Sequence, residues 1–236
     1  MVDFDTGPRL LTVQTATPGG GIALTEGDRL VGEISLNILK TPATWLLDAL
    51  DTLLTSTGWS LENLDGFGVV AGPGAFTGLR VGMATVKGLA MAVDRPVATV
   101  SSLECLALQV PFAAMPVCTM LDARKQEVYA ALFAPRGAEV RILEDEVVMS
   151  PEAFLEKCQG ETVFVGGGAT VYRTLITRIL GPRAHFLCGL FDQPRAGLAV
   201  QLVLREWQAG RMRPAEQVQP RYIRPSEAEL NHPHAG

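Results

Sequence analysis

A glycine-rich turn between a buried strand and a long helix constrains this fold more than any other feature of the sequence. The apolar run at residues 67–71 predicts the strand, and Gly72, Gly74 and Gly78 follow it in the segment GPGAFTG. Backbone N–H groups at the start of a helix can bind an anion in such a place. The segment lacks both the end of a P-loop and the dinucleotide fingerprint. The turn is therefore either close strand–helix packing or a phosphate loop without groups for chemistry.

The helix after this turn has two apolar sides. At 100° per residue, large side chains form a stripe suited to a sheet, namely Leu79, Met83, Val86, Ala90 and Val93. A second arc is formed mainly by small residues: Gly78, Gly82, Ala84, Thr85, Gly88 and Ala92, with Val81 and Leu89 among them. Glycines inside a helix cost about 0.5–1 kcal/mol each relative to alanine, so a close contact should offset them. That contact is either with a helix of the same chain at residues 42–57 or with a helix of another protein.

Composition narrows the class of protein. The chain has 236 residues, 47% of them hydrophobic, which is enough for one large domain or two small lobes. Its formal net charge of −5 lacks the basic footprint of direct nucleic-acid binders. No apolar run reaches membrane-spanning length, and the start MVDFD is followed by no signal-like apolar core. We therefore expect a cytoplasmic protein that contacts neither membrane nor RNA directly.

The order of predicted elements repeats along the chain. The first part has strands at 10–15, 22–25, 29–36, 67–71 and 96–100, with helices at 42–57, after the glycine turn, and from Ser101 to before Pro111. The second part has strands at 116–121, 127–133, 139–149, 162–165 and 185–187, with helices at 151–158, from the glycines at 166–168 to about 180, and at 196–209. This repeat predicts a duplicated, two-lobed α/β fold with mixed sheets. We expect a first lobe at 1–111, completed by a helix at 194–210, a smaller lobe at 112–193, and a surface tail at 211–236.

Residues for catalysis or metal binding are scarce. The three histidines are His185, His232 and His234. They form no metal-binding motif and two lie in the tail, so we expect neither a metal site nor a catalytic triad, with His185 as a core histidine. The four cysteines are Cys105, Cys118, Cys158 and Cys188. Their spacing fits no zinc site, and we expect reduced, mostly buried thiols.

Two further segments leave alternatives open. Asp122 ends an apolar strand, where it could hold Mg²⁺, cap the turn or pair with Arg124. The equivalent position in the first unit is Gln14, a poor sole ligand for Mg²⁺. Gly166, Gly167 and Gly168 after a strand could accommodate an adenosine base or form a flexible turn.

Several segments, in order along nearly the whole chain, resemble the TsaB (YeaZ) family, the non-catalytic relative of the transferase TsaD. The most specific is AGPGAFTGLRVG at 71–82, followed by ATVKGLA at 84–90, SSLE at 101–104 and DARKQEVY at 122–129. LTVQTAT at 11–17 and VQPRYIR at 218–224 extend the resemblance toward both ends. Family members usually carry Asp where Gln14 stands, and often a His-Ser-Glu run where this chain has Lys40-Thr41-Pro42.

The resemblance implies the two-lobed fold of actin, hexokinase and Hsp70, which is ribonuclease H-like. It implies a role in making threonylcarbamoyladenosine in tRNA, where TsaD is the catalyst and carries the metal and nucleotide. A TsaB-type protein holds TsaD through helices of its first lobe, TsaE joins as an ATPase, and tRNA is reached only through the complex. The same helices would serve a homodimer when the protein is alone. The resemblance implies no catalytic residue and no required cofactor, and leaves open a nucleotide at the interface with the partner.

These considerations assign two sets of residues. The expected partner interface is Trp45, Leu46, Ala49, Gly78, Val81, Gly82, Ala84, Thr85, Gly88, Leu89 and Ala92. The expected vestigial phosphate or nucleotide loops are Gly72, Gly74, Thr77, Gly78, Asp122, Gly166, Gly167 and Gly168. The rival function is a nucleotide-dependent ATPase or phosphotransferase using these loops. A peptidase has less support, because the sequence offers no triad and no pair of metal ligands.

Overall fold

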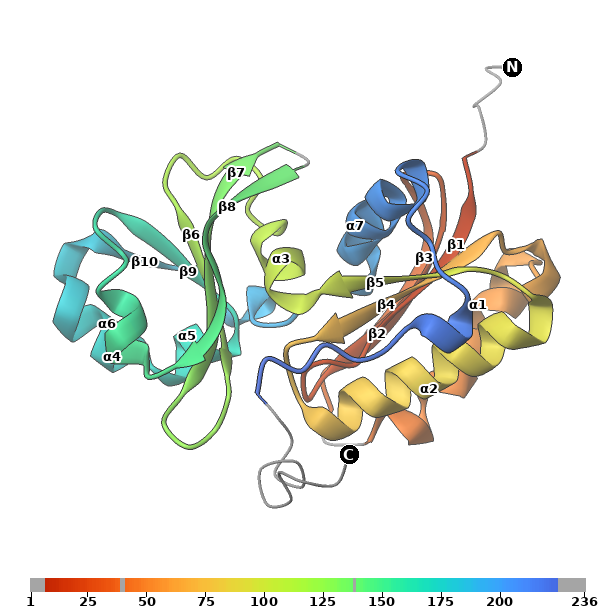
Figure 1. Cartoon of the computed structure of the whole chain (residues 1–236), viewed down its shortest axis with the longest axis horizontal. Helices are drawn as coiled ribbons and strands as arrows, with labels where there is room; N and C mark the ends of the chain where they lie inside the picture. Colours follow the sequence, from red (N-terminus) through yellow and green to blue (C-terminus); the bar gives the residue numbers. More distant parts are fainter. Residues whose placement is uncertain (1–6, 39–40, 138, 225–236) are drawn as a thin grey trace.

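The computed structural model describes residues 7–38, 41–137 and 139–224, which form two lobes, each built on a five-stranded mixed sheet (Figure 1). The first sheet contains β1 (Arg9–Gln14), β2 (Gly20–Glu26), β3 (Arg29–Leu36), β4 (Gly66–Gly72) and β5 (Val97–Ser101). The second contains β6 (Val117–Asp122), β7 (Val128–Arg136), β8 (Glu139–Met149), β9 (Thr162–Val165) and β10 (Ala184–Phe186). The helices are α1 (Leu46–Thr57), α2 (Phe76–Val93), α3 (Ser102–Ala107), α4 (Pro151–Leu155), α5 (Gly167–Val171), α6 (Arg173–Leu180) and α7 (Ala196–Gln208).

Both sheets have the same topology. The strand orders are β3-β2-β1-β4-β5 and β10-β9-β6-β7-β8, so the first strand of each unit lies at the centre of its sheet. In each sheet the first three strands pair antiparallel, and the fourth and fifth join in parallel. The predicted duplication is therefore confirmed, and the fold is of the two-lobed actin/hexokinase/Hsp70-like class.

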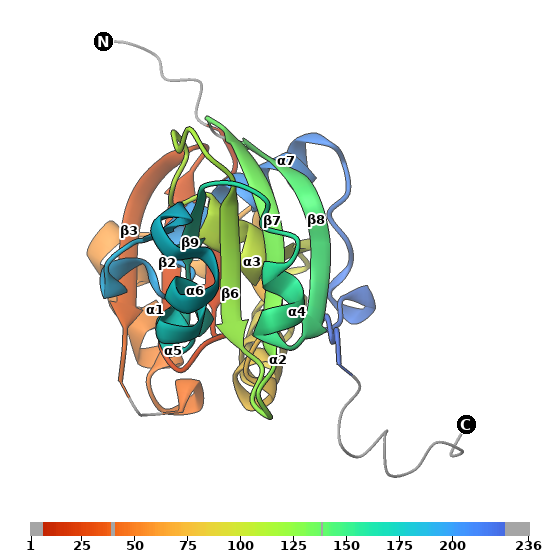
Figure 2. The ribbon, with the colours of Figure 1, turned by 90° about the vertical axis from the view of Figure 1, so that its left-hand side faces the viewer.

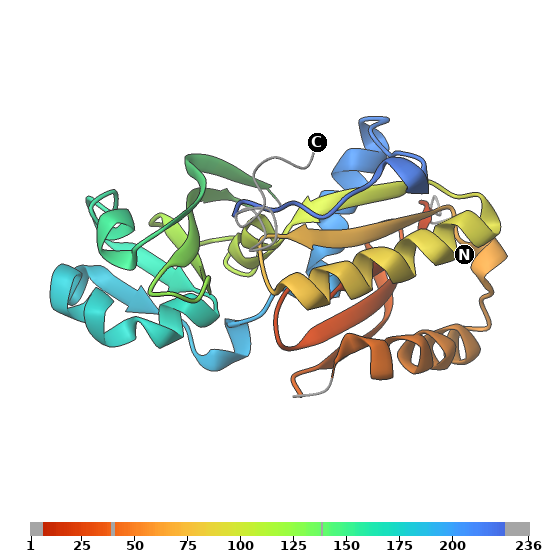
Figure 3. The ribbon, with the colours of Figure 1, turned by 60° about the horizontal axis from the view of Figure 1, so that its bottom comes forward.

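Helices cover both faces of the first sheet. Alternate residues of β1 point to opposite faces, as the two-residue period of a strand requires. Leu11 and Val13 pack in the core formed with α1 and α2, whereas Leu10 packs in the core formed with α7. Helices α1 and α2 consequently lie on the same face, which Figure 3 presents to the reader.

The second sheet is covered unequally. Helices α4, α5 and α6 contribute Phe154, Ala169 and Ile176 to the core on one face, and Figure 2 shows the three helices together. Helix α3 packs Leu103 and Leu106 against the other face. Because α3 follows directly from β5 of the first sheet, it lies between the two lobes (Figure 1).

Capping explains several element boundaries. The Ser101 hydroxyl accepts hydrogen bonds from the N–H groups of Leu103 and Glu104, both at 3.1 Å, so Ser101 begins α3 as predicted. Gly58 ends α1 with φ of 69°, the left-handed conformation predicted for it.

Two predicted helices differ from the structure. Thr41 and Pro42 begin only a 3₁₀ turn, Pro42–Thr44, and α1 starts separately at Leu46. The helix predicted from the glycines at 166–168 to about 180 is broken at Tyr172, whose φ and ψ are −98° and 15°. No proline marks this break, so helical periodicity alone could not locate it.

Candidate functional site

The glycine turn is packed against the chain's own backbone. A Cβ atom on Gly74 would lie 2.0 Å from the carbonyl oxygen of Ala16, and one on Gly78 would lie 2.1 Å from that of Thr15. The N–H of Ala75 donates to the Ala16 carbonyl at 2.7 Å. Gly72 adopts φ of 129°, and its missing Cβ leaves room for the Arg221 carbonyl. These glycines therefore allow strands, turn and helix to approach closely, which is the structural one of the two predicted roles.

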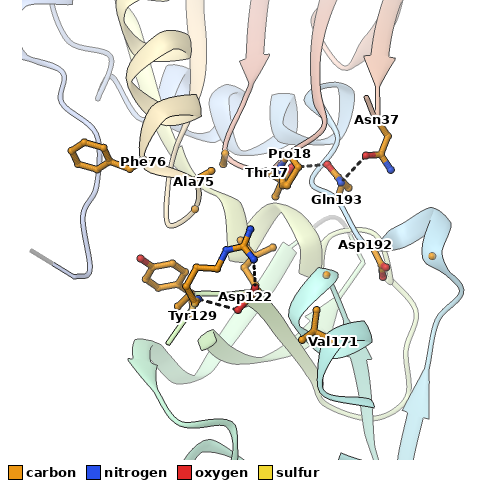
Figure 4. Close-up of a pocket in the computed structure, with 17 residues that line it drawn as sticks. Thr17, Pro18, Asn37, Ala75, Phe76, Asp122, Tyr129, Val171, Asp192 and Gln193 are labelled. Carbon is orange, nitrogen blue, oxygen red and sulfur yellow. Dashed lines mark hydrogen bonds and ion pairs between the residues drawn. The ribbon is translucent and has the colours of Figure 1, made fainter. Parts of the chain in front are cut away.

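A cavity of about 630 Å³ lies between the lobes, next to this turn (Figure 4). Polar side chains from both lobes and from the segment before α7 line it, including Thr17, Asn37, Asp122, Asp192 and Gln193. The Thr17 hydroxyl donates to Gln193 Oε1 at 2.6 Å, and Gln193 Nε2 donates to Asn37 Oδ1 at 3.3 Å. These bonds attach the segment before α7 to the first lobe.

Gln14 belongs to the same hydrogen-bond network, where it binds Thr17. Its side chain is fully buried, and its Nε2 donates to the Thr17 hydroxyl at 2.9 Å. Its Oε1 has no hydrogen-bond partner within the described ranges. Gln14 is therefore a neutral amide that fixes the cavity wall through Thr17.

The cavity fits a polyphosphate poorly. Asp122 Oδ1 accepts the backbone N–H of Arg124 at 2.9 Å, and its Oδ2 lies 3.4 Å from Arg124 Nη1. Asp122 thus both caps the turn and pairs with the only cation among the described lining residues, while Asp192 adds a second carboxylate. Two carboxylates against one guanidinium leave the lining negative, which disfavours a phosphate chain.

The second glycine loop is also filled by the protein. A Cβ on Gly166 would lie 2.3 Å from the Met120 carbonyl oxygen, and one on Gly168 would lie 2.8 Å from the Leu121 carbonyl carbon. Gly167 faces the cavity and donates its N–H to the Asp192 carbonyl at 3.0 Å. Thr77 is exposed on α2 and is not among the residues lining the cavity. Of the predicted loop residues, the structure brings Gly74, Asp122 and Gly167 to one cavity.

Helix α2 presents its large apolar stripe to the sheet. Leu79, Met83, Val86 and Ala90 are buried, and Val93 is half-buried. The glycines of the small-residue arc divide into two groups. A Cβ on Gly82 would lie 2.1 Å from Thr15 Oγ1, and the Thr15 hydroxyl donates to the Gly78 carbonyl at 2.8 Å. Gly78 and Gly82 are therefore buried against Thr15, which corrects the expectation that they face a partner.

Part of the expected interface on α1 also lies in the core. Trp45, Leu46 and Ala49 are all buried and pack with the first sheet. The reason is that α1 uses its one apolar stripe to cover the sheet. The exposed apolar residue of this helix is Leu47, at 58% exposure, which the sequence analysis did not select.

Small and apolar residues are exposed on the outer side of α2. Ala84, Gly88 and Ala92 are exposed at spacings of four residues, and no atom lies within 4 Å of a Cβ built on Gly88. Met91 extends this surface at 56% exposure. Val81, Thr85 and Leu89 border it as half-buried residues. We call the exposed set Ala84, Gly88, Met91 and Ala92 the outer face of α2.

The two charged residues of α2 border this face, because Arg80 and Lys87 lie one helical turn before Ala84 and Met91. Arg80 Nε donates to the Tyr222 hydroxyl at 3.2 Å, and Lys87 Nζ donates to the carbonyls of Glu216 and Val218 at 3.3 and 3.2 Å. Both cations are thus used by the C-terminal segment of the same chain. Met91 could have been found from the sequence, since it is a large apolar residue outside the sheet-facing stripe.

The remaining sequence predictions have mixed outcomes. Cys105, Cys118 and Cys158 are buried free thiols, whereas Cys188 is exposed. His185 is 43% exposed, 3.8 Å from Glu161, and is not a core residue because it lies on the edge strand β10. His232, His234 and Lys40 lie outside the described residues. Across residues 7–38, 41–137 and 139–224, no three or more His, Cys, Asp or Glu residues gather where they could hold a metal ion, and no helix is long and apolar enough to cross a membrane.

Comparisons with known proteins assign the sequence to one group. The family model described as "TsaD: tRNA N6-adenosine threonylcarbamoyltransferase" matches residues 40–231. The tRNA threonylcarbamoyladenosine biosynthesis protein TsaB of Bacillus subtilis is 27% identical over 226 residues, covering 93% of this chain and 96% of that protein. The TsaB protein of Escherichia coli is 31% identical over 166 residues, covering 68% and 71% of the two chains.

A solved structure and a transferase relative support the same family assignment. A solved structure from Pseudomonas aeruginosa, described as similar to peptidase YEAZ, superposes with a TM-score of 0.80 at 30% identity, covering 92% of this chain and all of that one. A tRNA N6-adenosine threonylcarbamoyltransferase from Novosphingobium aromaticivorans is 45% identical, but only over 69 residues, 29% of this chain and 20% of the transferase.

Proposed function

Because this chain belongs to the TsaB (YeaZ) family, we propose that it is a non-catalytic subunit in tRNA N6-threonylcarbamoyladenosine biosynthesis. It binds and stabilises a TsaD-type transferase and works together with a TsaE-type ATPase. Its net charge of −5 suits a subunit that reaches tRNA only through the complex.

The outer face of α2 carries this proposal. A solvent-facing helix surface normally bears charged residues, whereas this one presents Ala84, Gly88, Met91 and Ala92. Gly88 lowers helix stability by about 1 kcal/mol relative to alanine. No contact within the described part of the chain offsets that cost, because nothing lies near its Cβ position. A partner helix packed closely over Gly88 would supply the missing contact.

The geometry of α2 suits helix–helix packing. Its 18 residues give a length of about 27 Å. Small residues every fourth position form a shallow groove that accepts the ridge of another helix at an axial distance of ~8 Å. Met91 adds flexible apolar area to this face at 56% exposure. In the absence of the transferase, a second copy of the chain would cover the same face as a homodimer.

Replacing Gly88 by leucine tests this interface. The added side chain meets no atom of its own chain, so we expect Gly88→Leu to fold with at least wild-type stability. We expect its affinity for the cognate TsaD-type protein, measured by calorimetric titration, to fall at least tenfold. The matched control is Thr177→Leu, an exposed position on α6 of the other lobe, which should leave affinity unchanged. Wild-type affinity of folded Gly88→Leu would overturn the interface.

The rival enzyme function places nucleotide chemistry in the interlobe cavity. The negative lining and the pairing of Asp122 with Arg124 weigh against it. Titration of the isolated protein with Mg-ATP discriminates between the two functions. We expect no binding up to millimolar ligand; micromolar binding that is lost in Asp122→Ala would favour the ATPase or phosphotransferase.

A further inference from the structure

The segment after α7 runs from the first lobe to the second. Residues 211–224, which we call the C-terminal strap, leave α7, follow the first sheet and end beside the second lobe (Figure 1). The sequence predicts a tail on the surface here. Ala215 and Val218 are instead buried in the core of the first lobe.

The strap is attached to the first lobe by backbone bonds. Val97 of β5 and Arg213 exchange two hydrogen bonds, at 2.8 and 2.9 Å, so the strap caps the edge of the first sheet. Further along, the Arg221 N–H donates to the Ala71 carbonyl at 2.8 Å. The Arg221 carbonyl occupies the space left by Gly72 of the glycine turn. A side chain on Gly72 would therefore displace the strap.

The strap contacts the second lobe through two arginines. Arg221 Nη1 lies 3.1 Å from Glu146 Oε2 on β8, and the Glu146 side chain is only 7% exposed. Arg224 pairs with Glu127, and its Nη1 donates to the Ala123 carbonyl at 2.9 Å. Both acceptors belong to the connection between β6 and β7. The two ion pairs thus join one end of the strap to β8 and to the β6–β7 loop.

The strap adds a third crossing between the lobes, beside the hydrogen bond that the Ser101 hydroxyl of β5 donates directly to Glu146 of β8. The chain itself crosses twice, through α3 and through residues 187–195 before α7. Figure 3 shows the strap on one side of the molecule and residues 187–195 on the other. Two connections leave a hinge axis about which lobes can rotate, whereas a third connection away from that axis blocks the rotation.

We propose that residues 211–224 act as a strap that holds the two lobes at one separation, through the Arg221–Glu146 and Arg224–Glu127 ion pairs. Its release would let the interlobe cavity open or close. Lys87 and Arg80 of α2 bind the strap and lie one helical turn from Met91 and Ala84 of the outer face. Ala84, Gly88, Met91 and Ala92 stay exposed with the strap bound, so the strap fixes lobe separation without covering the proposed partner surface.

The test measures the distance between the lobes. Spin labels are placed on cysteines introduced at the exposed positions Ser56 and Arg178, in a background in which the exposed Cys188 is changed to serine. Pulsed dipolar spectroscopy on the labelled protein with an unchanged strap should give one narrow distance distribution. In Arg221→Gln/Arg224→Gln, we expect a distribution at least twice as wide or a second distance.

Two further variants control this test. Arg211→Gln removes an arginine of the same segment whose partner, Glu206, belongs to α7 of the same lobe, so it should leave the distribution unchanged. Glu127→Gln/Glu146→Gln breaks the same two ion pairs by changing their partners in the second lobe. This double variant should widen the distance distribution. An unchanged narrow distribution in both double variants, with folding verified by circular dichroism, would overturn the strap.

Discussion

The two lobes share one strand order but differ in the helix that follows the fourth strand. In the first lobe, α2 is a continuous helix of 18 residues whose outer face carries no charge. In the second lobe, the equivalent region is split into α5 and α6, of five and eight residues, and exposes Arg173 and Arg178. The two lobes therefore share a strand order but expose different residues on the helix after the fourth strand. We expect partner binding to belong to the first lobe because its helix is long and exposes the small residues Ala84, Gly88 and Ala92 at spacings of four.

The ends of the central strands differ in a related way. Gln14 ends β1 as a fully buried amide, whereas Asp122 ends β6 at the cavity and pairs with Arg124. In both lobes the polar residue at this place is used to hold a local turn. The comparison supports a subunit whose cleft is structural and whose first-lobe surface carries the function.

The largest expected effect separates the two kinds of glycine in α2. In Gly78→Ala the added Cβ would lie 2.1 Å from the Thr15 backbone carbonyl, which cannot move aside cheaply. We expect a loss of about 2–3 kcal/mol in the free energy of unfolding, measured by urea denaturation. Gly88→Ala meets no atom and should gain up to about 1 kcal/mol. Equal effects at both positions would contradict the assignment of Gly78 to internal packing and Gly88 to a partner.

A charge introduced on the outer face of α2 should weaken binding of the TsaD-type protein more than a charge introduced on α6 of the second lobe. Met91→Glu places a carboxylate in the proposed interface, where it would be desolvated without a partner. We expect at least a tenfold loss in affinity for the TsaD-type protein. Ile179→Glu on α6, at 41% exposure, is the matched change in the second lobe and should alter affinity less than twofold. Similar losses at both sites would show that the lobes do not differ in partner binding.

The two carboxylates that pair with strap arginines should respond oppositely to pH. Burial raises the pKa of Glu146, outweighing the Ser101 hydrogen bond and the Arg221 charge, so its stabilising contribution decreases as pH rises from about 4.5 through the raised pKa. The hydrogen bond from Arg211 lowers the pKa of Glu206, so its contribution decreases as pH falls through the lowered pKa.

Stability measured against pH in two variants checks these signs. The wild-type protein should lose some stability as pH rises above about 4.5, and Glu146→Gln should abolish that loss. It should also lose some stability as pH falls below about 4.5, and Glu206→Gln should abolish that second loss. The second effect should be the smaller one, because Arg211 is 54% exposed and solvent screens its ion pair with Glu206. If both substitutions changed the pH dependence of stability in the same direction, Glu146 and Glu206 would not have the opposite environments assigned to them.

The smallest effect concerns the thiols. Cys188 is exposed, whereas burial raises the pKa of the Cys105 thiol to about 12 and so removes its reactive thiolate. At pH 8, iodoacetamide should label Cys188 rapidly and leave Cys105 unlabelled until the protein is denatured. Mass spectrometry of peptides from the native protein measures both, and rapid labelling of Cys105 would contradict its burial in the core.

The sequence predicted much of the fold because its patterns are local. Apolar runs located the strands, Ser101 and Gly58 marked helix ends, and element order indicated the duplication. It did not separate Gly82 from Gly88, because the two glycines differ only in a contact with Thr15, which is 67 residues away from Gly82 in the chain. Likewise, periodicity showed that α1 is amphipathic but not that Trp45 belongs to the buried side. The path of the strap depends on ion pairs such as Arg221–Glu146, which join residues far apart in the chain.

We propose that the first lobe of this protein holds a TsaD-type transferase through the outer face of α2. The most direct test reconstitutes tRNA threonylcarbamoylation from the cognate TsaD-type and TsaE-type proteins and measures threonylcarbamoyladenosine in tRNA by mass spectrometry. We predict modification with wild-type chain and with Thr177→Leu, and at least a tenfold lower yield without the chain or with Gly88→Leu. Full modification without the chain, or with folded Gly88→Leu, would contradict the account.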